Sequence, residues 1–150
     1  MMDPFSIIAS AFSVTGAAVK AGKATYHLVD GIRDAPKDIT RLGEGLKGLY
    51  TVLRALERIL KQEAALGVKD VRLPEYMVAD VAELVSGCIG LFADIQKSTQ
   101  AYRGRDGQGP RTMFLGLRWE LYKRSEVARL EKALTDYKMA LGLGCQSLQM

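Results

Sequence analysis

The chain has 150 residues, of which 48% are hydrophobic, 25% are charged and 7% are aromatic. These values are typical of one ordinary soluble domain that is long enough to bury a core. The net charge of +4 is mild, which disfavours a histone-like or polybasic nucleic-acid protein. One histidine and two cysteines, Cys88 and Cys145, are too few for a disulfide framework or a Cys/His metal cluster. We therefore expect a cytoplasmic protein without a cofactor.

The first predicted helix opens with an uncharged stretch over residues 4–19, PFSIIASAFSVTGAAV. Asp3 and Pro4 are typical of an N-cap and a first helical position, and the helical pattern runs from about residue 4 to 30. Its apolar residues recur at Phe5, Ile8, Phe12, Val19, Tyr26 and Val29. A signal peptide is disfavoured because no positive charge precedes the stretch. A membrane span is disfavoured because a helix of this length covers only roughly 24 Å of a roughly 30 Å hydrocarbon layer. A buried or half-buried helix in a soluble bundle is the favoured interpretation.

The second predicted helix carries the strongest structural pattern in the chain. It follows the motif Asp34-Ala35-Pro36-Lys37-Asp38, and its apolar residues alternate in steps of three and four. They are Ile39, Leu42, Leu46, Leu49, Leu53, Leu56 and Leu60. An uninterrupted heptad pattern of this length predicts a long helix with one continuous buried face.

Two further long helices and a connector are predicted in the second half of the chain. After Leu73-Pro74 the apolar pattern resumes and reaches Tyr102, with Met77, Val81, Leu84, Cys88, Leu91 and Ile95. The glycine-rich run 103–110 predicts a loop, and residues 111–123 can form a short connecting helix or an irregular hydrophobic connector. Ser125 is predicted as the N-cap of the last helix. The last helix has its apolar residues at Val127, Leu130, Leu134, Tyr137, Leu141 and Leu148. The sequence thus predicts an all-α, up-and-down bundle of four long helices plus a short connecting helix.

Many glycines lie inside the predicted helices, and each weakens its helix by about 0.5–1 kcal/mol relative to alanine. They are Gly16, Gly22, Gly43, Gly45, Gly48, Gly87, Gly90, Gly142 and Gly144. Glycine lets helices approach closely where they cross. Alternatively, the weakened helices make a metastable bundle that one helix leaves at modest cost.

No catalytic constellation emerges from the residue patterns. His27 has no cysteine near it in the sequence, and residues 104–110 lack the Gly-Lys-Ser/Thr ending of a phosphate-binding loop. Asp80, Glu83 and Asp94 lack the Glu-x-x-His motifs of a di-iron bundle. We expect the protein not to be an enzyme, with no catalytic, cofactor-binding or metal-binding residues.

Positive charge is concentrated in residues 103–124. The cations of this segment are Arg103, Arg105, Arg111, Arg118, Lys123 and Arg124. Asp106 and Glu120 oppose them, and apolar residues including Trp119 lie between them. This mixture is suited to contact with anionic lipid head groups. A solvated loop that closes one end of the bundle is the alternative. A nucleic-acid partner is not expected, because a recognition helix and an aromatic stacking platform are missing.

Four short motifs, in this order, resemble one protein family. They are Met2-Asp3-Pro4-Phe5-Ser6-Ile7-Ile8-Ala9-Ser10, Asp34-Ala35-Pro36-Lys37-Asp38-Ile39, Leu117-Arg118-Trp119 and Arg124-Ser125-Glu126-Val127. Together they resemble the fungal HeLo-like N-terminal domains of STAND or NOD-like receptors. That family is similar in architecture to the four-helix bundle of the mixed-lineage kinase-like executioner of necroptosis. The resemblance implies a single domain over residues 1–150, expected at the N-terminus of a longer protein.

The resemblance also implies a cell-death effector of fungal innate immunity and heterokaryon incompatibility. In that family a STAND receptor or an amyloid-motif partner, in cis or in trans, brings copies together. The copies self-associate, move from the cytoplasm to the plasma membrane and disrupt it with the N-terminal helix. Carried onto this chain, the inserting residues are Phe5, Ile7, Ile8, Phe12, Val14 and Val19.

Small residues in the same stretch, Ser6 with Ser10 and Ala9 with Ser13, suit close helix packing within an oligomer in lipid. The alternative function is a non-lytic helical interaction module that regulates a STAND receptor.

Overall fold

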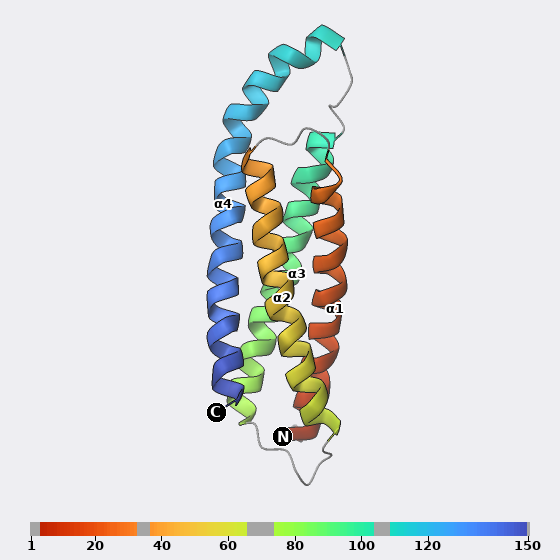
Figure 1. Cartoon of the computed structure of the whole chain (residues 1–150), viewed down its shortest axis with the longest axis vertical. Coiled ribbons are helices and arrows are strands. Elements are labelled where there is room, and N and C mark those ends of the chain that lie inside the picture. Colours follow the sequence, from red (N-terminus) through yellow and green to blue (C-terminus); the bar gives the residue numbers. More distant parts are fainter. Residues whose placement is uncertain (1–3, 33–36, 66–73, 104–108, 150) are drawn as a thin grey trace.

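The computed structural model describes residues 4–32, 37–65, 74–103 and 109–149, with side chains for residues 6–32, 37–65, 74–100 and 125–149. This part of the chain forms the helices α1 (Pro4–Asp30), α2 (Lys37–Ala65), α3 (Glu75–Arg103) and α4 (Gly109–Gln149). The helices run up and down along one long axis (Figure 1). The predicted all-α bundle of four long helices is confirmed.

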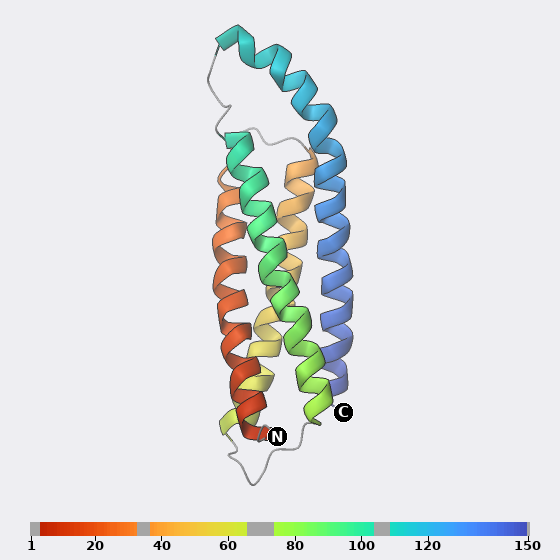
Figure 2. The ribbon, with the colours of Figure 1, turned by 180° about the vertical axis from the view of Figure 1, so that it is seen from behind.

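α1 and α4 lie diagonally opposite each other in the bundle. α1 packs mainly against α2 and α3, and α4 packs mainly against the same two helices. Figure 1 shows α2 in front, between α1 and α4, and Figure 2, seen from behind, shows α3 in front. α2 and α3 are therefore the two helices that hold both α1 and α4.

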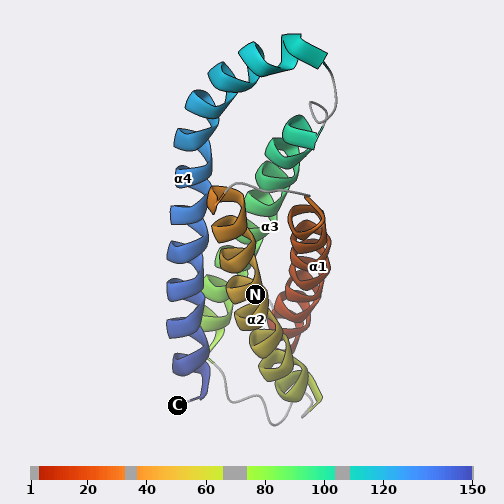
Figure 3. The same cartoon turned by 45° about the horizontal axis from the view of Figure 1, so that its top comes forward.

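The last helix is longer than predicted, and no separate connecting helix precedes it. α4 is a single helix of 41 residues, so residues 111–123 belong to it and Ser125 lies in its interior instead of at its N-cap. Pro110 is tolerated in the first turn, where its missing N–H has no partner to lose, and strong helix formers follow it. The first turns of α4 project beyond the ends of the other three helices (Figure 3).

The core is built around the leucine pattern of α2. Every predicted position of that pattern, from Ile39 to Leu60, is buried. The buried apolar residues of the same core are Ile8, Ala11, Ala18 and Val29 from α1, Val78, Val81, Val85, Cys88, Leu91, Phe92 and Ile95 from α3, and Val127, Leu130, Leu134, Leu141 and Leu148 from α4. Met77, Leu84 and Tyr137, which the spacing also predicts, are half-buried and pack against this core.

The close-approach explanation of the helical glycines holds at some positions and not at others. An ideal Cβ would lie 3.2 Å from Leu134 at Gly45 and 3.1 Å from Val81 at Gly144, and at Gly87 it would overlap the ring of Tyr137. These three glycines let α4 approach α2 and α3 closely.

Two other glycines have open space around them. No atom lies within 4 Å of the place that a Cβ would take at Gly90 or Gly142. These two residues weaken their helices without allowing any closer approach.

Candidate membrane-contact site

The side of α1 that faces the core is made largely of small residues. Its buried positions follow steps of three and four residues and are Ile8, Ala11, Thr15, Ala18, Gly22, Thr25 and Val29. From Ala11 to Thr25, no member of this series is larger than threonine. Small side chains let backbones approach closely but bury little apolar area, and apolar burial contributes only about 25 cal/mol per Å². We call this series the small-residue face of α1.

The buried threonines of the small-residue face satisfy their hydroxyls within the helix. Thr15 Oγ1 donates a hydrogen bond to Ala11 O at 2.7 Å, and Thr25 Oγ1 donates to Ala21 O at 2.7 Å. Thr25 Oγ1 also accepts a hydrogen bond of 2.8 Å from Gln96 Nε2 of α3. The bond from Gln96 links α1 to α3. The two bonds from threonine hydroxyls to backbone carbonyls of the preceding turn slightly weaken and bend α1.

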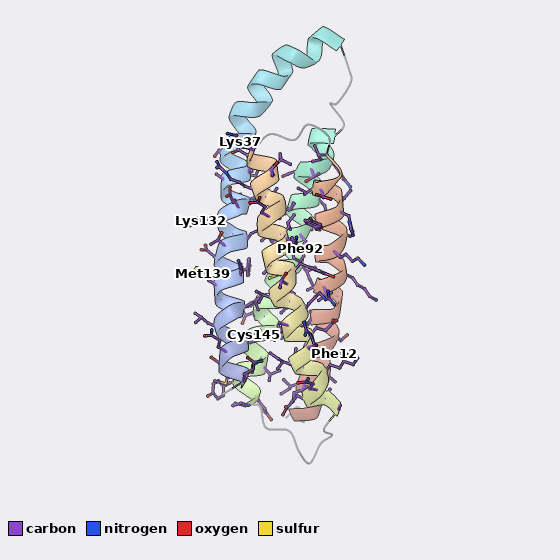
Figure 4. All side chains as sticks on the ribbon, in the orientation of Figure 1. Phe12, Lys37, Phe92, Lys132, Met139 and Cys145 are labelled. Atoms are coloured by element: carbon purple, nitrogen blue, oxygen red, sulfur yellow. The ribbon has the colours of Figure 1, made fainter. Side chains whose placement is uncertain are left out.

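Gly22 lies where three helices meet. An ideal Cβ at this residue would lie 3.2 Å from the Phe92 ring of α3 and 3.6 Å from Tyr50 Cδ2 of α2. Phe92 is fully buried, and Figure 4 shows it in the middle of the bundle. α1 rests directly on this ring because Gly22 has no side chain.

The predicted inserting residues all lie on α1, and most of them flank the small-residue face instead of belonging to it. Ile8 is buried in the core. Half-buried against the core are Ile7, Phe12, Val14 and Val19. The side chain of Phe5 lies outside the described residues. The sequence therefore identified the helix but not which of its side chains face the core.

The outward side of α1 is small and uncharged over its first half. Ser6, Ala9, Ser10 and Ser13 are all exposed, so the residues suited to helix packing in an oligomer are accessible. In the stretches of chain that the structure describes, no helix combines the length and the hydropathy needed to cross a membrane.

The basic segment lies at the opposite end of the bundle from the N-terminus of α1. Arg103 ends α3, Arg111, Arg118, Lys123 and Arg124 lie in the first half of α4, and Arg105 is outside the described residues. The side chains of this segment are likewise outside the described set. Figure 1 shows the first half of α4 extending past one end of the bundle, whereas the chain begins at the other end. The structure therefore does not bring the two predicted lipid contacts together.

The residues considered for nucleophilic chemistry are not primed for it. Burial raises the pKa of the Cys88 thiol to about 12 and also raises the pKa of Cys145. Both thiols therefore stay protonated at neutral pH, whereas the thiolate is the nucleophile. His27 is exposed and its ring lies 5.9 Å from the ring of Tyr26. Among the described side chains, no three or more of His, Cys, Asp and Glu gather where they could hold a metal ion.

Fold and site together define a four-helix bundle whose N-terminal helix is uncharged over residues 4–19 and packs on the rest through small side chains. The family described as "Pigment biosynthesis cluster protein PigL N-terminal" matches residues 2–150, and the chain belongs to it. This is a HeLo-like family of fungi, which confirms the resemblance at that level. No curated protein and no solved structure matches the chain.

Proposed function

We propose that this domain is a cell-death effector that self-associates on activation and disrupts the plasma membrane through α1. The observation that supports the proposal most is the construction of α1. Its first half carries no charge, packs on the core through small side chains, and leaves Phe12 and Val19 only half-buried. Such a helix loses less buried apolar side chain when it leaves the bundle than the leucine-rich α2 would, and it has apolar side chains to bury elsewhere.

The two environments of α1 call for the same small residues. In water, Ala18 and Gly22 let the helix rest on α2 and α3. In lipid, small residues let helices pair closely, because apolar side chains alone give no drive for association there. Clustering of several domains raises their effective concentration and shifts the population toward copies whose α1 is released and paired.

The basic segment supplies attraction to anionic lipid in this proposal. Arginine and lysine near a negatively charged surface contribute about 1 kcal/mol each. Because this segment and the N-terminus of α1 lie at opposite ends of the bundle (Figure 1), α1 must leave its resting place to enter the membrane that the segment contacts. In this proposal, membrane disruption therefore requires the release of α1 from the bundle.

The domain acts through binding and assembly, without catalysis. In the resting state it is cytoplasmic. A STAND receptor or an amyloid-motif partner, in cis or in trans, brings copies together, and the assembly moves to the plasma membrane. Its lipid partners are the anionic lipids of that membrane.

Dye release from vesicles tests the proposal. We expect the purified domain, clustered artificially, to release dye from anionic vesicles more strongly than the monomer does, and to leave neutral vesicles intact. Phe12→Asp places a charge in the middle of the uncharged stretch and should abolish release. A folded domain that causes no leakage in any state would contradict the proposal and favour the non-lytic interaction module.

A matched pair of exposed positions separates insertion from folding. Ser13 and Ala24 both lie exposed on α1, so aspartate at either position leaves the resting bundle intact. Ser13→Asp charges the inserting stretch and should abolish leakage, whereas Ala24→Asp lies beyond it and should retain most of it. Equal leakage by the two folded variants would show that α1 does not insert.

A further inference from the structure

Two opposite outer faces of the bundle carry opposite charge. The outward positions of α2 bear Lys37, Lys47, Arg54, Arg58 and Lys61, with Glu44 as the exception, and all are exposed. The outward side of α3 bears Asp80, Glu83 and Asp94, with Lys97 as the exception, and these are exposed as well. α2 and α3 lie on opposite sides of the molecule, as Figures 1 and 2 show.

The heights of these residues along the bundle can be compared through a shared level. Gly22 marks it, because its ideal Cβ would lie 3.6 Å from Tyr50 of α2 and 3.2 Å from Phe92 of α3. α2 and α3 run in opposite directions and rise equally per residue. A residue that follows Tyr50 by a given number of positions in α2 therefore lies level with the α3 residue that precedes Phe92 by the same number. The reverse holds for residues that precede Tyr50.

Four pairs of charged residues are level by this measure, to within one residue. They are Lys61 with Asp80, Arg58 with Glu83, Lys47 with Asp94, and Glu44 with Lys97. Every pair joins opposite charges, and the exception on one face is level with the exception on the other. In the described part of the chain, none of these eight side chains forms an ion pair of its own. The nearby cation Arg129 is bound to Glu126 at 2.6 Å, and this hydrogen bond and the charge of Glu126 raise its pKa, with a smaller contribution from Asp94.

We infer that a second copy of this chain docks with its α3 side on the α2 side of the first. A copy shifted sideways without rotation presents its α3 charges at the height of their α2 counterparts. Rotation by 180° about the stacking direction would make the facing helices parallel. It would bring like charges level at both ends, Lys61 with Lys97 and Glu44 with Asp80, so the charges favour the unrotated copy. An anionic lipid surface would suit the α2 side alone but leaves the matching charges of α3 unexplained.

The contact uses a different surface in each copy, so it repeats and builds an open linear stack. Exposed charge pairs are individually weak and screened by salt. The domain is therefore monomeric when dilute and stacks when it is concentrated or clustered. Because the copies are related by translation, every α1 lies on the same side of the stack. The inference does not depend on membrane disruption, although a row of aligned α1 helices serves it.

Sedimentation velocity at low ionic strength over a range of concentrations tests the stack with two complementary variants. One is Arg58→Glu with Lys61→Glu, which reverses the α2 side. The other is Asp80→Lys with Glu83→Lys, which reverses the α3 side. We expect the wild type to assemble reversibly and to dissociate as salt is added, and each variant alone to need at least about tenfold higher concentration. An equimolar mixture should regain assembly, because the reversed sides attract each other and each variant keeps one native side.

A control variant changes the charge by the same amount elsewhere. Lys20 and Lys23 are exposed on α1 with the same spacing as Arg58 and Lys61, and Lys20→Glu with Lys23→Glu should retain assembly. Circular dichroism confirms that all variants are folded. A monomeric wild type at low salt, or a mixture that fails to assemble, would overturn the inference. Binding to phosphatidylserine vesicles is measured as well. The inference would also be overturned if the wild type bound these vesicles but never self-associated, and the α2 variant lost that binding.

Discussion

α1 and α2 are neighbours of nearly equal length, 27 and 29 residues, that bury one face each with the same spacing. α2 fills that face with leucines, and burial of each leucine contributes about 1.5–3 kcal/mol. α1 fills it with alanine, threonine and glycine. One periodicity therefore specifies two kinds of contact, one in which large side chains fill volume and one in which backbones approach closely. Because the second kind buries less apolar side chain, we expect α1 to leave the bundle at a lower free-energy cost than α2 would.

The largest effect is expected from the leucine face. Leu53 is fully buried, so Leu53→Ala should lower the free energy of unfolding by about 2–5 kcal/mol. Ala18→Gly, on the small-residue face, should lower it by about 1 kcal/mol. Urea denaturation measures both. Equal losses at the two positions would remove the contrast between the two helices.

Gly22→Ala should come next, although alanine favours a helix more than glycine does. The added methyl would press on the buried ring of Phe92 at 3.2 Å, and overpacking of this kind lowers the free energy of unfolding by about 1–3 kcal/mol. In a chain that already carries Phe92→Leu, the ring is gone, so adding Gly22→Ala should lower the free energy of unfolding by less than it does in the wild type. Wild-type stability of Gly22→Ala would show that α1 is not held by close approach.

The hydrogen bond between α1 and α3 is expected to contribute less. Thr25→Val leaves Gln96 Nε2 without the partner it has at 2.8 Å, and the free energy of unfolding should fall by about 0.5–1.5 kcal/mol. Thr51 is the matched control on α2, because its exposed hydroxyl bonds only within its own helix, to Lys47 O at 2.9 Å. Thr51→Val should change the stability by less than about 0.5 kcal/mol. The same change at both positions would deny Gln96 a role in holding α1.

The smallest expected effect is a gain. At Gly90 no atom lies within 4 Å of the place that a Cβ would take, so Gly90→Ala should raise the free energy of unfolding by about 0.5–1 kcal/mol. Gly87→Ala, one turn earlier on α3, should lower it because the methyl would overlap the ring of Tyr137. A thermal melt of the two variants checks the opposite signs. Two changes of the same sign would mean that the packing of α4 does not depend on Gly87.

α2 could be predicted in full from the sequence, whereas the buried face of α1 could not. Leucine at every step of three and four leaves α2 one face to bury. On α1, alanine, serine, threonine and glycine occur on both sides, and only the positions of Phe92 and Tyr50 decide that Gly22 faces inward and Ser13 outward. Large apolar residues such as Phe12 therefore predicted the helix correctly but did not identify the face that it buries.

The start of α4 was predicted wrongly for a related reason. A serine at residue 125 is typical of an N-cap, but an exposed serine is also tolerated within a helix when the flanking residues favour helix. The burial of Leu148, by contrast, follows the predicted spacing through Gly142 and Gly144. Periodicity of large side chains thus predicted the long contacts, and the positions that depend on a partner's shape needed the structure.

Hydrogen exchange of the resting monomer, resolved helix by helix, tests most directly whether α1 is the separable element. Amides that open locally report free energies below that of global unfolding. We expect α1 to exchange through an opening of lower free energy than α2, and Gly22→Ala to lower the value for α1 more than for α2. One common free energy for α1 and α2, equal to that of global unfolding, would contradict the account.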